Sequence, residues 1–256
     1  MYRNAIVRPP ADNFGEGLTT VELGRPSVPL ALEQHERYCE ALIACGLALT
    51  RLPADPRHPD STFVEDAAVL TPRGAILTRP GAASRAGEVA SIEEALSPFF
   101  RDFRRIQAPG TLDGGDVCEA GDHFFIGVSA RTNEEGARQL AALLREDGFS
   151  STLVDIRGIS GILHLKSGIA WLDGRTLVVI DALAGDSAFH GWDRVPVEGF
   201  EDYAANCVRI NDAVLFAAGF PLLERALRER GQRLTVLPTS EFQKMDGGLS
   251  CLSLRF

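Results

Sequence analysis

The feature that most constrains this chain is a unit that recurs along it. Two short apolar strands joined by a tight turn are followed by an amphipathic segment and then by a third strand. The two-strand hairpins start near residues 66, 116, 167 and 206, so the spacings are 50, 51 and 39 residues. Periods of this size indicate a repeated supersecondary unit that buries its apolar face against its neighbours. The chain is therefore expected to fold as an array of similar units.

The two ends of the chain supply a fifth unit. Apolar alternation predicts strands at residues 4–8 and 251–255, and helical spacing predicts a helix near 30–45. Pairing of the two terminal strands would close a ring and remove sheet edges, as propellers do. An open α/β sheet has a similar alternation of strands and helices and is the alternative. We predict the ring, a fivefold pseudosymmetric α/β propeller of ββαβ-type repeats, as a single domain over residues 1–256.

Composition narrows the classes of function. The formal net charge is -9 and no basic cluster is present, which argues against nucleic acid as a partner. The five cysteines include no Cys-x-x-Cys pair, so neither a disulfide framework nor a zinc site is indicated. The first residues lack an apolar signal region, and no run approaches the ~18 apolar residues of a membrane span. We expect a protein of the reducing cytoplasm that binds a small molecule, and a homodimer is left open.

Polar residues recur at the entrance to the hairpins. Glu65 and Asp66 stand at the first entrance, Asp113 at the second and His164 at the third. Cys251 occupies the matching place in the unit that the two chain ends would form. Equivalent positions in a closed ring converge on its axis, so the repeat gathers these side chains around one pocket. Together they supply a nucleophile, a base, an orienting acid and a site for a cation.

Each of these residues also has a plainer interpretation. A lone cysteine such as Cys251 often packs as a small hydrophobic residue. Glu65 and Asp66 would suit an exposed turn, and Asp113, before two glycines, would suit a hairpin turn. His164 lies between two leucines and would suit a core position. The functional interpretation therefore depends on their shared place in the repeat and not on any one of them.

Two arginines follow successive hairpins. Arg85 comes after the first and Arg131 after the second, beside Ser84 and Thr132 as candidate helix caps. Most arginines at helix starts are simply solvated, but a positive charge there opposes the helix dipole, which indicates another reason for both. An arginine pair suits the binding of a substrate carboxylate.

Residues 9–28 are rich in proline, glycine and polar side chains and predict a long surface loop. Long loops in compact domains are often lids or binding loops. Leu18, beside Gly17, would be a tethering contact unless the loop covers a site.

Taken together, the motifs resemble those of the guanidino-group modifying enzymes, and most closely the dimethylarginine dimethylaminohydrolases. The similarity covers nearly the whole chain, in order: FVED at 63–66, TRPGAASR at 78–85, TLDGGDV at 111–117, SARTNEEGA at 129–137, LHLKS at 163–167, NC at 206–207 and LSC at 249–251. The resemblance implies an α/β propeller that hydrolyses N-omega-methylated arginine to citrulline and methylamine or dimethylamine. It implies no cofactor and no metal.

The resemblance also implies roles for individual residues. Cys251 would be the nucleophile that forms a covalent thiouronium, His164 the acid and base, and Asp113 the partner of the histidine. The residues that would contact substrate are divided by the group they bind: Glu65 and Asp66 for the guanidinium, Arg85 and Arg131 for the α-carboxylate, and Asp60 with the Leu18 region for the α-amino group.

Two positions depart from the wider superfamily. Lys166 stands where deiminases and amidinotransferases have an aspartate, and Asp113 stands where many relatives have a glutamate. Another guanidine or ureido hydrolase, such as an arginine deiminase-like enzyme or a citrulline hydrolase, is the alternative activity. A non-catalytic binding protein on the same fold is a second alternative, against which the joint presence of Cys251, His164 and Asp113 argues.

Overall fold

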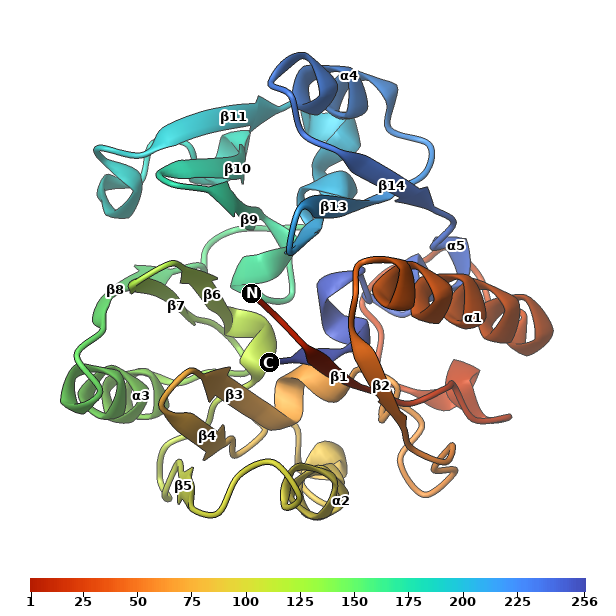
Figure 1. The fold of residues 1–256 in the computed structure, drawn as a ribbon, viewed down its shortest axis with the longest axis vertical. Coiled ribbons are helices and arrows are strands. Elements are labelled where there is room, and N and C mark those ends of the chain that lie inside the picture. The colour runs from red at the N-terminus through yellow and green to blue at the C-terminus, as the bar shows by residue number, and fades with distance from the viewer.

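The structure is a computed structural model that describes residues 1–256, and its strands form five separate three-stranded sheets. Each sheet consists of an antiparallel pair of strands and a third strand that runs parallel to the second strand of the pair, so all five have one strand arrangement. The sheets surround a central axis (Figure 1). The predicted fivefold propeller is confirmed, and the open sheet is wrong.

Four of the sheets use consecutive strands, and their hairpins begin within two residues of the predicted starts. The strands are β3 (Ala68–Thr71), β4 (Gly74–Leu77) and β5 (Phe103–Arg105); β6 (Val117–Ala120), β7 (His123–Val128) and β8 (Ser150–Asp155); β9 (Ile169–Asp173), β10 (Thr176–Ile180) and β11 (Asp193–Val197); and β12 (Val208–Ile210), β13 (Ala213–Ala217) and β14 (Leu234–Leu237).

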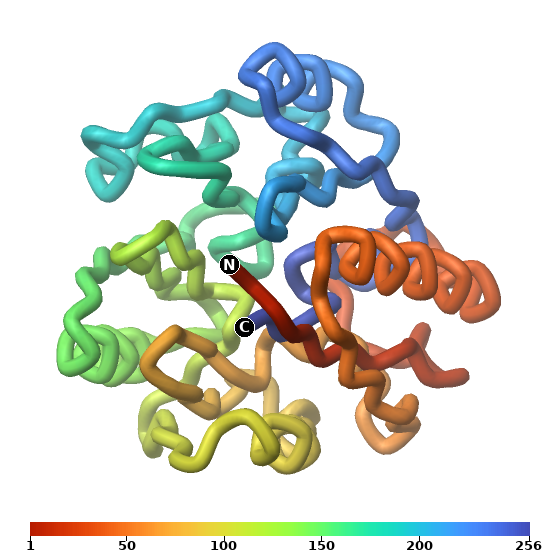
Figure 2. The backbone as a smooth tube through the Cα atoms, in the orientation of Figure 1, coloured from red at the N-terminus to blue at the C-terminus, as the bar shows by residue number.

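The fifth sheet joins the two ends of the chain. Strand β1 (Asn4–Val7) lies between β15 (Leu254–Arg255), with which it is antiparallel, and β2 (Ala48–Arg51), with which it is parallel. Ala5 is paired with Arg255. The two ends of the chain therefore lie beside each other near the axis (Figure 2), and the ring closes as predicted.

Helices connect the second and third strands and lie on the outside of the ring (Figure 1). They are α1 (Val28–Ala44), α2 (Glu88–Leu96), α3 (Glu134–Glu146) and α4 (Pro221–Glu229), and a short α5 (Ser240–Gln243) precedes the C-terminal segment. In the third unit, between β10 and β11, two 3₁₀ turns, Asp181–Leu183 and Ser187–Phe189, replace the helix. This segment contains Gly185, and the Asp186 side chain accepts a bond from the Ala188 backbone, which favours a turn over a helix. None of the helices combines the length and the apolar character needed to cross a membrane.

The candidate helix caps at Ser84 and Thr132 are wrong. Ser84 lies in a 3₁₀ turn, Ala83–Arg85, before α2 begins. The cap of α3 is Asn133, whose side chain accepts a hydrogen bond of 2.8 Å from the Gly136 backbone. The Thr132 hydroxyl instead accepts a bond from the backbone of Asp113. Thr132 therefore belongs to the site described below and not to the helix.

A 3₁₀ turn precedes the first strand of every sheet, with at most two residues between them. These turns are Val64–Ala67, Gly114–Asp116, Leu165–Ser167, Gly199–Ala205 and Ser250–Leu252. A side-chain oxygen at or beside one turn accepts a backbone N–H at the next: Asp66 from Gly115 (2.8 Å), Asp116 from Leu165 (2.9 Å) and Asn206 from Ser250 (2.9 Å). These bonds fasten neighbouring units to one another, so residues from distant parts of the chain meet around the axis.

Candidate active site

A small cavity lies where the inter-unit turns meet, and every predicted site residue except Glu65 lines it. Its lining includes Leu18, Asp60, Asp66, Arg85, Asp113, Arg131, His164 and Cys251. The convergence that the repeat predicted is therefore present for the cysteine, the histidine and two of the acids. The cavity encloses about 20 Å³, which is room for roughly one water molecule.

Asp113 holds His164 in one orientation. The Oδ2 atom of Asp113 lies 3.1 Å from Nε2 of His164, and its Oδ1 accepts a hydrogen bond of 2.9 Å from the Gly81 backbone. The backbone N–H of Asp113 donates to the Thr132 hydroxyl at 3.1 Å. Because the carboxylate and its backbone are both anchored, the imidazole has a fixed partner on the Nε2 side.

The glycines after Asp113 permit a close approach. A Cβ atom at Gly115 would stand 2.7 Å from Nδ1 of His164 and 2.8 Å from Oδ1 of Asp66, both of which are too short. Any side chain here would push the histidine and the acid apart. The Asp113–Asp116 segment is therefore not a plain hairpin turn. It contains a 3₁₀ turn, Gly114–Asp116, and the absence of a side chain at Gly115 lets His164 and Asp66 lie close to each other.

The surroundings of His164 favour its charged form. Burial alone would lower the pKa of this imidazole, but the negative charges of Asp66, Asp116 and Asp113 outweigh it and raise the pKa to about 9. At neutral pH the histidine therefore carries a proton that it can donate. Asp116 also accepts bonds from the Leu165 backbone and the Ser129 hydroxyl, so it fixes the segment on which His164 stands.

This protonation predicts a pH-dependent contribution to stability. The folded pKa of His164, about 9, exceeds the ordinary value of 6.5, so its contribution is complete below about pH 6.5 and disappears as the pH rises through 9. Comparing wild type with His164→Gln in denaturant, we expect the wild-type advantage in free energy of unfolding to fall between about pH 6 and pH 10, by about 3 kcal/mol. Titrating groups that do not interact with His164 cancel in this difference, and an advantage that stays constant or grows would contradict the assignment.

Asp66 and Arg85 form a buried ion pair at the wall of the cavity. Burial opposes ionisation of Asp66, but His164 and Arg85 lower the pKa of this carboxyl to about 2. Arg85 also binds both carboxylate oxygens of Glu88 and the backbone oxygens of Asp60 and Phe63. Most of the Arg85 donors are therefore occupied. Asp66 is an ionised acceptor that faces the cavity at neutral pH.

Arg131 differs from Arg85 in this respect. Its side chain lines the cavity, is half-buried, and has no hydrogen-bond or ion-pair partner in the structure. The guanidinium is therefore available to an anionic group of a ligand, whereas Arg85 has little remaining capacity.

Cys251 lies in the turn Ser250–Leu252 at the floor of the cavity, and its backbone N–H donates to Gly248 at 3.2 Å. Burial first, and then the negative charges of Glu65 and Asp66, raise the pKa of this thiol to about 12. At neutral pH the Cys251 side chain is therefore a thiol and not a thiolate. A cation bound beside Asp66 would offset these charges and favour the thiolate.

The loop that contains Leu18 closes the cavity. The Leu18 backbone N–H donates to both oxygens of Asp60, at 3.0 and 3.2 Å. Two residues further, Thr20 donates to Asp246 through its backbone and its hydroxyl, and the Thr19 hydroxyl donates to the Lys244 backbone. These contacts hold the loop beside the cavity, the place that a lid would occupy. Because so little space is enclosed, a ligand larger than water requires the loop to open.

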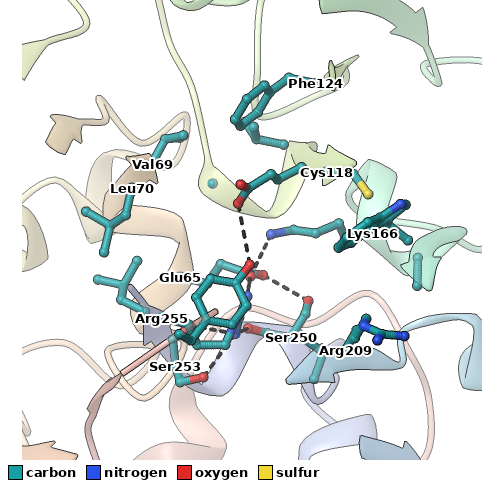
Figure 3. Close-up of a pocket in the computed structure, with 18 of the residues that line it drawn as sticks. Glu65, Val69, Leu70, Cys118, Phe124, Lys166, Arg209, Ser250, Ser253 and Arg255 are labelled. Atoms are coloured by element: carbon teal, nitrogen blue, oxygen red, sulfur yellow. Dashed lines mark hydrogen bonds and ion pairs between the residues drawn. The ribbon is translucent and has the colours of Figure 1, made fainter. Parts of the chain in front are cut away.

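Glu65 is the exception among the predicted site residues, and its placement is a correction. Its side chain lines a different cavity, where it contacts Lys166, Arg255 and Ser250 (Figure 3). Adjacent residues of the turn Val64–Ala67 face different sides, so the turn presents Asp66 to the cavity of Cys251 and turns Glu65 away. The structure therefore leaves Asp66 without Glu65 as an acceptor for a bound cation.

A metal site is a possible alternative for part of this cluster. Ligand atoms of Asp66, Asp113 and His164 lie within 4.8 Å of one another. Both carboxylates already have cationic partners, however, because Asp66 binds Arg85 and Asp113 binds the protonated histidine. The arrangement fits the transfer of a proton better than the binding of a metal.

Comparisons with known proteins agree with this arrangement. The family model described as arginine deiminase matches residues 58–195. The chain is 44% identical to N(G),N(G)-dimethylarginine dimethylaminohydrolase of Pseudomonas aeruginosa, over 100% of both chains.

Two solved structures resemble it over 100% of both chains, each at 44% identity and a TM-score of 0.96. One is a dimethylarginine dimethylaminohydrolase of Pseudomonas aeruginosa, a cysteine-to-serine mutant complexed with citrulline. The other is a dimethylarginine dimethylaminohydrolase with a histidine-to-glycine change, as an adduct with S-methyl-L-thiocitrulline.

Proposed function

The chain belongs to the dimethylarginine dimethylaminohydrolase family, and we propose that it hydrolyses N-omega-methylated L-arginine to L-citrulline and methylamine or dimethylamine. The observation that carries this proposal is one cavity that joins a cysteine thiol, a protonated histidine with its aspartate, and the ionised carboxylate of Asp66. This set matches a guanidinium substrate: an acceptor for the cation, a nucleophile for its carbon and an acid for the departing amine.

The substrate is oriented by charge at both ends. Asp66 accepts hydrogen bonds from the planar guanidinium; at about 4 Å and an effective dielectric near 20 such a contact is worth on the order of 4 kcal/mol before desolvation. Arg131, which has no partner of its own, binds the α-carboxylate together with the remaining N–H of Arg85. Asp60 and the lid at Leu18 lie beside these groups and suit the α-amino group.

The reaction proceeds in two halves. A guanidinium carbon is a poor electrophile, so the bound cation must first favour the Cys251 thiolate. The sulfur attacks that carbon, and protonated His164 donates its proton to the leaving nitrogen, which departs as a neutral amine. A covalent thiouronium remains on Cys251. Neutral His164 then removes a proton from water, the hydroxide attacks the same carbon, and the thiolate leaves to give citrulline.

Position 166 bears on substrate choice. Lys166 points away from the cavity toward Glu65, so neither residue offers an acceptor to a second terminal NH₂ of arginine. An NH₂ without an acceptor loses roughly 1–3 kcal/mol, and a methyl group in contact with apolar walls gains about 0.8 kcal/mol. Both effects favour methylated substrates over arginine.

The test is a citrulline assay on a panel of substrates. We expect monomethyl- and asymmetric dimethylarginine to exceed arginine in kcat/KM by roughly 10- to 10³-fold, from the sum of the two energies above. Symmetric dimethylarginine is expected to be poor, because it carries a methyl group on the side that faces Asp66. Arginine ranked above both favoured methylarginines would contradict the proposal and indicate an arginine deiminase.

A substitution of Arg131 tests how the carboxylate is bound. Arg131→Ala is expected to raise KM for methylarginine by roughly 10- to 100-fold, since a charge-assisted hydrogen bond contributes about 1.5–3 kcal/mol. A simple alkylguanidine has no carboxylate, so its KM is expected to change little. Arg138→Ala, which removes an exposed partner of Glu134, is the control. Equal effects on both substrates would indicate a structural role for Arg131.

We also propose that residues 1–256 act as one catalytic domain in a reducing compartment such as the cytoplasm. Turns from several units contribute side chains to the one cavity, and all five cysteines are free thiols. The homodimer stays a prediction.

A further inference from the structure

A second cavity, of about 100 Å³, is lined by close chain neighbours of the catalytic candidates. Glu65 precedes Asp66, Lys166 follows His164 by two residues, and Ser250 precedes Cys251. Three segments that must be held at fixed distances for the reaction therefore meet a second time, outside the substrate cavity (Figure 3).

The carboxylate of Glu65 joins these segments. Its Oε1 lies 2.6 Å from Nζ of Lys166 and 2.7 Å from Nη2 of Arg255, and its Oε2 accepts a hydrogen bond of 2.9 Å from the Ser250 hydroxyl. The side chains are 4% exposed for Glu65, 14% for Lys166 and 12% for Arg255, so little solvent competes for these contacts.

Arg255 extends the connection to the turn that carries the nucleophile. Its Nη1 donates to the backbone oxygens of Ser250 and Ser253, both at 2.8 Å, and to the Ser253 hydroxyl at 2.9 Å. The same guanidinium thus binds the backbone on both sides of Cys251 and the carboxylate beside Asp66. This fixes the nucleophile relative to the acceptor for the substrate cation.

We propose that Glu65, Lys166 and Arg255 form a positioning cluster that fixes the relative places of Cys251, His164 and Asp66, an inference that rests on the proposed function. None of the three touches the substrate cavity. They act through their chain neighbours, and misplacement of reacting groups by about 1 Å is enough to cost roughly 10²-fold in rate.

The composition of the cluster favours positioning over stabilisation. Two part-buried cations face the buried Glu65 and the part-buried Glu119, because Glu119 also lines this cavity and lies close to Lys166 and Arg255. Buried ion pairs are weak evidence for stability, since the cost of desolvation can exceed the attraction. Apolar side chains would fill the same space, but they would not define one geometry for three separate segments.

The cluster also lies within electrostatic reach of the nucleophile. The negative charges of Glu65 and Asp66 disfavour the Cys251 thiolate, and the positive charge of Lys166 favours it. His164 lines the same cavity as Cys251, and Tyr203 is close enough to interact with it electrostatically. Removing Glu65 or Lys166 therefore changes the reactivity of the thiol in opposite directions, in addition to any loss of geometry.

The experiment uses Glu65→Gln, Lys166→Met and the double variant in the full-length protein. All three are expected to lower kcat for methylarginine by roughly 10- to 100-fold, with KM within about threefold of wild type. The control is Asp147→Asn, which breaks a part-buried ion pair with Arg104 far from both cavities and is expected to leave kcat unchanged. If the three variants keep the wild-type kcat and lose only thermal stability, as Asp147→Asn is expected to do, the proposal is overturned.

Alkylation of Cys251 by a haloacetamidine supplies a readout that does not depend on the substrate. At a pH below the pKa of the thiol the rate follows the thiolate fraction. We expect faster alkylation in Glu65→Gln, slower alkylation in Lys166→Met, and a near wild-type rate in the double variant, where the net charge of the cluster is restored. In that variant kcat is nevertheless expected to stay low, because the link between segments is missing.

The two readouts separate the possible failures. If wild type alkylates but does not hydrolyse methylarginine, the proposed function fails. If wild type hydrolyses methylarginine and the double variant matches it in both kcat and alkylation, the positioning cluster fails. Loss of alkylation in all three variants, with intact thermal stability, would also overturn the proposal, because it would contradict the opposite electrostatic effects of Glu65 and Lys166.

Discussion

Cys251→Ser is expected to abolish hydrolysis of methylarginine, with kcat lowered by at least about 10³-fold. A serine hydroxyl has almost the same size, so the turn Ser250–Leu252 is retained, but it ionises far less readily than a thiol and is a much weaker nucleophile. The bound substrate cation can make a thiolate available; it cannot make an alkoxide available at neutral pH. The measurement is steady-state citrulline production, with substrate binding followed separately by calorimetry.

Selective labelling supplies the second half of this test. Mass spectrometry after treatment with a haloacetamidine is expected to find the label on Cys251, because the amidinium of the reagent resembles the guanidinium that Asp66 binds. Cys39, Cys118 and Cys207 are buried away from the cavity, and Cys45 is half-buried. Cys45→Ser is therefore the matched control and is expected to keep its activity. Near wild-type turnover in Cys251→Ser would end the covalent mechanism.

The ring could be predicted because its cause is visible in the sequence. Hairpins that recur about 50 residues apart each need a neighbour to bury their apolar face, and the two terminal strands complete a fifth sheet. The third unit departs from the repeat for a physical reason. Its connection contains Gly185 and Asp186, which favour turns, and the structure has two 3₁₀ turns there in place of a helix.

The repeat also predicted which chain segments meet, but not which way each side chain points. Glu65 and Asp66 are chemically alike and adjacent, and nothing local distinguishes them. Their directions depend on cations from distant segments: Arg85 for Asp66, and Lys166 with Arg255 for Glu65. A sequence pattern contains the positions of these partners but not the geometry that brings them together.

Some residues that shape the site had no distinct signal of their own. Asp116 and Thr132 act on the backbone beside the catalytic candidates, through bonds to Leu165 and Asp113. Asp116 could have been found from its equivalence to Asp66 in the repeat, because both accept a backbone N–H from the next unit. A hydroxyl residue before a helix is typical of a cap, so the sequence favours Thr132 in that role, but Asn133 is the cap in the structure.

His164→Gln is expected to lower kcat by about 10²- to 10⁴-fold, the usual contribution of a positioned acid or base. The residue acts twice: the imidazolium protonates the departing amine, and the neutral imidazole then activates water. Glutamine is neutral and keeps a donor near Asp113, so the cavity is filled but no proton moves. The measurement is single-turnover kinetics with asymmetric dimethylarginine.

The leaving group distinguishes the two steps. Some substrates, such as an S-alkylthiocitrulline, lose a thiolate, which needs no proton from His164. In His164→Gln the attack by Cys251 on such a substrate is therefore expected to be much less impaired than the attack on dimethylarginine. Hydrolysis of the thiouronium still needs the base, so the covalent intermediate is expected to accumulate and to be visible by intact-protein mass spectrometry.

Asp113→Asn is the informative comparison, because it keeps the imidazole but removes the carboxylate that orients it and helps to raise its pKa to about 9. That variant is expected to retain partial activity on both substrates. Equal losses on the two substrates in His164→Gln, without an accumulated intermediate, would show that the histidine contributes only to the shape and charge of the cavity.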